Sequence, residues 1–232
     1  MRRSFLTALL GVLTTIGCTP LVPFHLGESA EVLRRGQVSL SGSAGGGAAG
    51  QADPSTASLG GIGTRIRVGV GHHQELGAEG TAISSTVQRD GVDWGAKLSW
   101  KGAPTSWFAA VLGFGYTHYI GSAVGADVAL IFSSPTSVRR PVGIFAGARF
   151  SLAVPARSDV YREGGLTEAL VFPVGMVIEP ARAVRLYLEG GFIAAFSQAH
   201  ADLDPVREVV HFTSYGGYGA LTVAFLFPTR SR

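Results

Sequence analysis

Histidines and carboxylates gather in one segment near the C-terminus, where they could do acid–base or metal chemistry. In the segment SQAHADLDPVREVVHFTSY these residues are His200, Asp202, Asp204, Glu208, His211 and Ser214. A histidine beside a carboxylate can polarise water, and the same groups can bind a metal ion. Their spacing matches no catalytic or metal motif, and the chain has no P-loop, CxxC or GxSxG pattern. We therefore expect solvated loop residues, with no catalytic residue, no metal and no cofactor, and an enzyme stays an alternative.

A second group of charged residues is spaced regularly within apolar segments. In VRLYLEGGFIAAF, residues 184–196, Arg185 and Glu189 share one face with Tyr187 when the segment is read with a period of two. The opposite face carries Leu186, Leu188 and further apolar residues. A helix would scatter these apolar positions around its circumference, so the period of two predicts a strand whose faces meet different media.

The same alternation recurs along the chain and predicts ten strands. Each is near or above the 9 to 11 residues with which a tilted strand crosses a bilayer. The predicted strands are 36–44, 60–71, 73–84, 92–101, 106–118, 121–133, 140–154, 167–179, 184–197 and 214–227.

The predicted connections alternate in length. Three of the odd-numbered connections are long, namely 45–59, 155–166 and 198–213, and none of the even-numbered ones is. Long loops on one side and short turns on the other are typical of barrels that cross the outer membrane.

The composition excludes some classes of protein. Only 15% of the residues are charged, against roughly a quarter in soluble proteins, while 46% are hydrophobic. Apart from the N-terminus, no run of about 18 apolar residues could cross a bilayer as a helix. Removing Arg2 and Arg3 would leave 17 basic residues against 16 acidic ones, and no basic patch is interleaved with aromatic residues, so we expect no nucleic-acid partner.

The N-terminus has the plan of a secretory signal peptide, with two arginines before an apolar run, and we assign residues 1–17 to it. The sole cysteine, Cys18, follows, and TIGC resembles a bacterial lipobox, although Thr15 stands where the pattern prefers leucine. This resemblance implies lipidation of Cys18; an incidental cysteine after an ordinary signal peptide is the alternative. Residues 18–35 are interpreted as a periplasmic tail.

The end of the chain resembles the terminal strand of bacterial outer-membrane proteins. YGGYGALTVAFLF alternates apolar residues up to Phe225 and Phe227, and only a tail of residues 228–232 follows. The resemblance implies that Phe225 and Phe227 form the signal that the barrel-assembly machinery recognises. Phe227 lies five residues before the end, which departs from the pattern.

Together these features resemble a small bacterial outer-membrane β-barrel protein over residues 36–227. The resemblance implies an all-β fold, a closed antiparallel transmembrane β-barrel of about ten strands (eight is the alternative), with lipid outside and the N-terminus in the periplasm. Closure has a physical reason, since an unpaired strand edge in lipid costs several kcal/mol for each backbone group.

In such a barrel the strand faces opposite the apolar faces would line the lumen. They carry Arg65, Arg67, Glu75, Glu79, Asp93, Lys97, Asp127, Arg149, Arg185 and Glu189. Five basic and five acidic side chains in a narrow ring should pair, because unpaired buried charges are costly. The sequence therefore predicts a structural or narrow-channel protein, with a small solute in the lumen as an open question. A lipid-anchored periplasmic lipocalin-like or sandwich domain, with its charged face in water, and a barrel hydrolase with a rim site are the alternatives.

Overall fold

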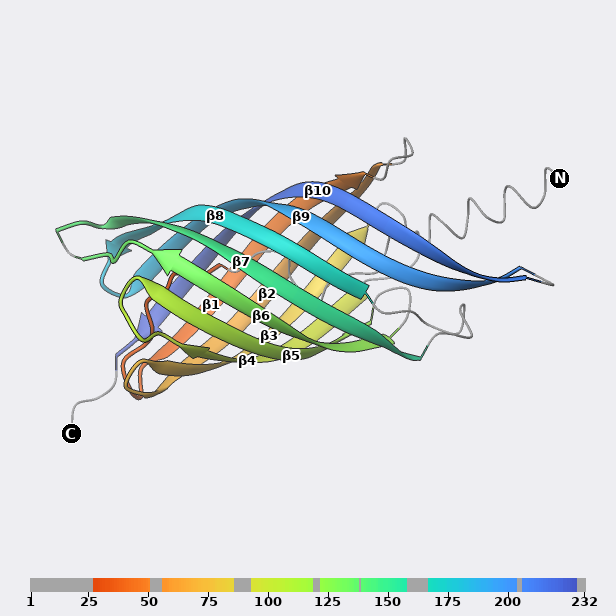
Figure 1. The fold of residues 1–232 in the computed structure, drawn as a ribbon. Coiled ribbons are helices and arrows are strands. Elements are labelled where there is room, and N and C mark those ends of the chain that lie inside the picture. Colours follow the sequence, from red (N-terminus) through yellow and green to blue (C-terminus); the bar gives the residue numbers. More distant parts are fainter. Residues whose placement is uncertain are drawn as a thin grey trace.

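Ten antiparallel strands close into one barrel in the computed structural model (Figure 1). The structure describes residues 27–50, 56–85, 93–118, 122–137, 139–157, 167–203 and 206–228. Each strand pairs with the next in sequence, and β1 pairs with β10 from Val38↔Phe227 to Gly50↔Tyr215. The strands are β1 (Val38–Gly50), β2 (Thr56–Gly71), β3 (Gln74–Ser85), β4 (Asp93–Gly102), β5 (Phe108–His118), β6 (Ser122–Ser133), β7 (Val142–Arg157), β8 (Thr167–Ala181), β9 (Val184–Leu203) and β10 (Val206–Phe227). The predicted all-β closed barrel of ten strands is confirmed.

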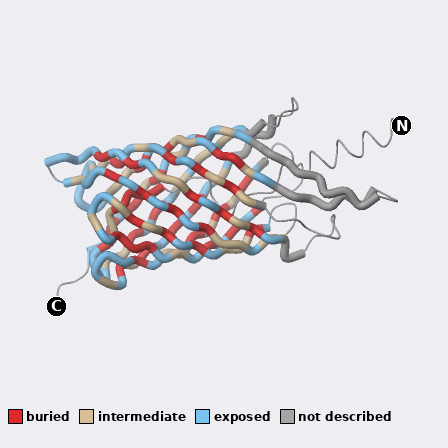
Figure 2. Tube along the Cα trace, in the orientation of Figure 1, coloured by how far each residue is buried: buried red, intermediate tan, exposed pale blue. Residues whose placement is uncertain are grey.

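Inward and outward positions alternate along the strands, as the period of two predicts (Figure 2). In β4, for example, Leu98 is 67% exposed on the outside while its neighbour Lys97 is 6% exposed. The buried positions of a closed, filled barrel face its inside, which we call the lumen. The charged residues of the strands therefore lie inside the barrel, away from solvent. Within the described residues, no helix is long and apolar enough to cross a membrane.

Two of the predicted connections are wrong over most of their length. β1 continues to Gly50, past the predicted end at residue 44, and β9 and β10 continue to Leu203 and from Val206. The stretch AGGGAAG, residues 44–50, has no alternation of polar and apolar side chains, yet its backbone pairs with both β2 and β10. Backbone pairing satisfies the peptide groups whatever the side chains are, so the side-chain pattern missed it.

The extension of β9 and β10 also changes the setting of the histidine- and carboxylate-rich segment. His200 and Asp202 lie on β9, and Glu208, His211 and Ser214 lie on β10, so they are strand residues rather than the predicted loop residues. Asp204 lies outside the described residues. For the other five residues the structure describes the backbone alone.

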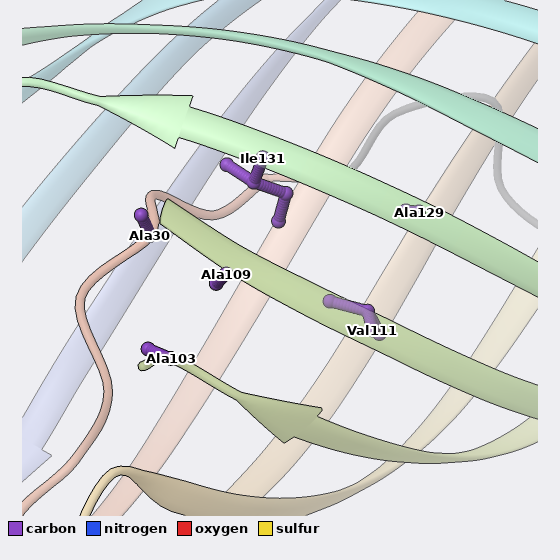
Figure 3. Packing of buried hydrophobic residues seen from close by; sticks show 6 residues of the cluster. All are labelled: Ala30, Ala103, Ala109, Val111, Ala129 and Ile131. Carbon is purple, nitrogen blue, oxygen red and sulfur yellow. The ribbon is translucent and has the colours of Figure 1, made fainter. Parts of the chain in front are cut away.

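Residues 27–35, called the inner segment below, run inside the barrel. The predicted tail is therefore wrong for this part, since Glu28 and Ala30 are buried by the strands around them. Ala30 packs against Ala103, Ala109, Val111, Ala129 and Ile131, which extend from β5, β6 and the end of β4 (Figure 3). Gly36, with φ of 76°, then turns the chain into β1, and its N–H donates to the carbonyl of Gly69. The signal peptide, Cys18, residues 19–26 and residues 229–232 lie outside the described residues.

Candidate functional site

A row of ion pairs crosses the inner faces of three neighbouring strands. Arg65 on β2 lies opposite Glu79 on β3, and Glu79 lies opposite Lys97 on β4. The Arg65 Nε and Nη2 atoms lie 2.9 and 2.8 Å from Glu79 Oε2, and Lys97 Nζ lies 3.9 Å from the same oxygen. The strand register therefore places alternating charges side by side at one height of the lumen.

The row continues past β5 to the other side of the lumen. Lys97 Nζ lies 3.6 Å from Asp127 Oδ2 on β6, and Arg149 Nε on β7 lies 2.7 Å from that oxygen. The Asp127 and Arg149 side chains are each 1% exposed. Gly113 on β5 leaves the path open, since a Cβ there would lie 3.0 Å from Asp127 Cγ and 3.1 Å from Lys97 Cδ. A glycine is thus needed where the two side chains pass over the intervening strand.

We predict that Gly113→Ala lowers the free energy of unfolding by about 1–3 kcal/mol, because the added methyl group overpacks the Lys97–Asp127 pair. Gly80→Ala is the matched control, since a Cβ at Gly80 meets nothing within 4 Å. Denaturant unfolding of the two variants beside the wild-type protein measures the difference. Equal stability of both variants would contradict the role given to Gly113.

The inner segment supplies a carboxylate to three buried cations. Glu28 Oε1 lies 3.5 Å from Arg65 Nη1, while Oε2 lies 3.2 Å from both Arg67 Nη1 and Lys101 Nζ. Lys101 also donates to the carbonyls of Ser29 and Glu31, at 2.6 and 2.8 Å. The Glu28 carboxylate therefore neutralises charges that the strands alone place close together.

Two wall carboxylates and one wall arginine hold the same segment at three other points. Glu75, which pairs with Arg67 at 3.2 Å, accepts the Leu33 N–H at 2.9 Å. Glu189 accepts the Gly27 N–H at 2.8 Å and the Tyr218 hydroxyl at 2.5 Å. Nearer the short turns, Arg185 binds Glu31 at 2.7 Å.

The structure places all ten predicted lumen charges on inward strand positions, and nine of them are buried; Arg185 is partly exposed. Arg185 and Glu189, four residues apart on one face, take different partners: Arg185 binds Glu31 and Glu179, and Glu189 binds Gly27 and Tyr218. Asp93 is buried on β4, at the end away from Lys101. Phe225 and Phe227 are half exposed on β10 where it meets β1.

Four charged residues of the site were not in the predicted set. Lys101 lies four residues after Lys97 on β4 and therefore shares its inner face, and Glu179 lies on the inner face of β8 next to Arg185. The period of two could have identified both. Glu28 and Glu31 lie in no strand, and no local pattern marks them. Their partners are 37 to 154 residues away in sequence.

The remaining lumen is filled by apolar side chains. Phe145, Val177, Tyr187 and Ala224 form one buried cluster, and Val171, Ile193 and Tyr218 form another. No group of three or more histidine, cysteine or acidic side chains among the described residues could hold a metal ion. The described lumen therefore contains paired ions and packed apolar side chains.

No family model and no curated protein sequence matches the chain. Among solved structures, it is similar to the Neisserial surface protein A (13% identity, 82% of this chain and 99% of that one, TM-score 0.40). It is also similar to the outer membrane protein OprG from Pseudomonas aeruginosa (8%, 87% and 100%, TM-score 0.41). A third similar structure is that of the outer membrane protein AlkL (10% identity, 91% of this chain and 99% of that one, TM-score 0.42). The similarity is one of barrel shape, and the closed strand register of this chain establishes its fold independently.

Proposed function

We propose that the chain is an integral protein of the bacterial outer membrane, a structural barrel or narrow channel with a charge-paired lumen. The observation that carries the proposal is the outer surface, where every strand exposes at least one large apolar side chain. Examples from β1 to β10 are Leu40, Ile62, Leu76, Leu98, Phe114, Val128, Ile144, Val174, Leu188 and Leu221. Soluble proteins rarely expose apolar patches larger than a few hundred Å², whereas lipid is the natural solvent for such a belt.

The burial pattern is the reverse of what a soluble lipocalin-like or sandwich domain requires. In that alternative the apolar face of β9 would pack in a core and its charged face would meet water. Instead Leu188 is 44% exposed and Glu189 is 6% exposed. The alternative is therefore not supported.

Aromatic contacts on the outer surface support two membrane interfaces. At one end of β4 and β5, Trp94 and Tyr116 have ring centroids 5.3 Å apart. At the other end, Trp107 and Phe132 stack with centroids 6.2 Å apart. Transmembrane barrels carry such aromatic girdles at both edges of their apolar band.

The lengths of the strands support an orientation with the N-terminal end of β1 towards the periplasm. At that end the connections are 72–73, 103–107, 134–141 and 182–183. The longest strands, β9 and β10 with 20 and 22 residues, are joined at the opposite end, where outer-membrane barrels carry their longer extracellular loops. Short turns face the periplasm in outer-membrane barrels. Lipid and the barrel-assembly machinery are the partners that this proposal implies, with Phe225 and Phe227 as the assembly signal and Cys18 as the lipidation site. The described residues offer no support for a rim hydrolase.

Membrane fractionation tests the proposal. We expect the protein to stay with the outer membrane in high salt, to require detergent for extraction, and to migrate differently in gel electrophoresis before and after boiling. The physical reason is that the apolar belt has no soluble partner, and that a closed barrel resists denaturation by detergent until it is heated. Release of the protein by salt alone would contradict the proposal.

A further inference from the structure

We infer that the inner segment is a displaceable plug in a pore for small anions, and that Glu28 occupies the anion site of this pore. The inference rests on the proposed function, because a pore requires a barrel that spans the membrane. It adds an activity, anion conduction, and names the element that suppresses it.

The barrel wall is rich in cations where Glu28 binds. Four cations lie there, and they contact the wall carboxylates of Glu75, Glu79 and Asp127, of which Asp127 also pairs with a fifth cation, Arg149, at 2.7 Å. The four cations are Arg65, Arg67, Lys97 and Lys101. The wall is therefore positive at this height, and a negative group must accompany it, since uncompensated buried charges are costly.

A group from outside the wall contributes negative charge at this place. It is a single carboxylate on a segment outside the barrel wall, in contact with Arg65, Arg67 and Lys101 at 3.2 to 3.5 Å. Three converging cations would bind a free anion with the same geometry. Glu28 thus occupies a ready-made anion site as a tethered ligand.

The inner segment is attached to the wall through side-chain contacts rather than through a strand ladder. A wall strand is hydrogen-bonded along both edges, for example β2 to β1 and to β3. Among the described backbone hydrogen bonds outside the strand ladders, none joins residues 27–33 to a strand. Side-chain contacts hold these residues, such as the Ala30 N–H to Ser133 Oγ at 2.9 Å. The segment can therefore leave without breaking a ladder of the barrel.

Departure of the inner segment would open space beside β4, β5 and β6. The wall beside Ala30 carries the small side chains of Ala103, Ala109 and Ala129 (Figure 3). Beyond the row of ion pairs, the inward positions of β4 and β5 carry Gly95 and Thr117, which pair with each other. The inner segment occupies the lumen beside Arg65, Arg67 and Lys101, so its departure would vacate a path of polypeptide width that these cations line.

The experiment measures ion current through the full-length protein in planar bilayers in potassium chloride. The wild-type barrel should conduct little. Glu28→Lys places a fourth cation among Arg65, Arg67 and Lys101, which should expel the inner segment and raise the mean current at least tenfold. His72→Lys is the control, because it introduces a lysine at an exposed turn of the barrel and should leave the current unchanged.

Selectivity is measured on Glu28→Ala, which adds no charge of its own. In a potassium chloride gradient the reversal potential should have the sign of the chloride equilibrium potential, and Arg67→Gln with Lys101→Gln in the same chain should reduce it. The gel mobility of unboiled samples confirms that each variant is folded. A folded Glu28→Lys and Glu28→Ala pair without increased current would overturn the plug, and cation selectivity would overturn the anion site. Extraction by salt would instead show that the proposed function has failed.

Discussion

Replacing Asp127 with alanine should lower the free energy of unfolding by about 3–5 kcal/mol, the cost of removing one partner from a buried ion pair. Asp127 Oδ2 lies 2.7 Å from Arg149 Nε and 3.6 Å from Lys97 Nζ, and all three side chains are at most 5% exposed. Without the carboxylate, two buried cations face each other across β5 and β6. Denaturant unfolding of the barrel in detergent, followed by tryptophan fluorescence, measures the loss.

A double variant separates the lost charge balance from lost packing. Asp127→Ala combined with Arg149→Met removes both charges of the closest pair, and we expect it to recover a substantial part of the stability lost in the single variant. Buried ion pairs can often be replaced by apolar side chains of similar volume at little cost in stability. Removal of one partner alone is costly, because it leaves the other charge buried and uncompensated. Equal stability of Asp127→Ala and the wild-type protein would contradict the importance of this pair.

Gly69→Ala should raise the ion current through the barrel at least tenfold, by the same route as Glu28→Lys but without a change in charge. A Cβ at Gly69 would lie 2.7 Å from both the carbonyl carbon of Arg34 and the carbonyl oxygen of Leu33. These are backbone atoms of the inner segment, so they cannot turn aside as the end of a flexible side chain would. The methyl group should therefore displace the segment where it leaves the lumen.

Gly71→Ala is the control for this variant, two residues further along β2. A Cβ there meets only the Gln74 side chain, at 3.9 Å or more, which is an ordinary contact. Planar-bilayer current for the two variants, each with its folded state checked by gel mobility, provides the comparison. If both variants conduct alike, the close approach of the inner segment to Gly69 does not close the pore.

The two glycine predictions also explain part of the high glycine content. The chain has 33 glycines, and the sequence shows only that many fall on inward positions. Gly113 makes room for an ion pair that crosses a strand, and Gly69 makes room for a second backbone. Gly80, by contrast, faces open space and could carry a side chain. These roles depend on neighbours that are remote in sequence.

The alternation of side chains determines most of the architecture by itself. In a strand, side chains two residues apart lie on the same face. Leu186 and Leu188 therefore share one face and Arg185 and Glu189 the other, and the same pattern predicts ten strands and their faces. Strand ends were predicted less well where pairing of the backbone extends a strand without help from side chains. Residues 44–50 show this, since their glycines and alanines pair with β2 and β10.

Only the tertiary structure decided what fills the barrel. The sequence indicates that charges such as Arg65 and Glu79 must pair, yet it does not reveal that Glu28 completes the set. The three cations that Glu28 meets lie 37, 39 and 73 positions after it in the sequence. Such contacts arise when β1 and β10 close the ring and the segment before β1 folds back into the lumen. Local periodicity specifies the wall, and closure in three dimensions specifies what the wall surrounds.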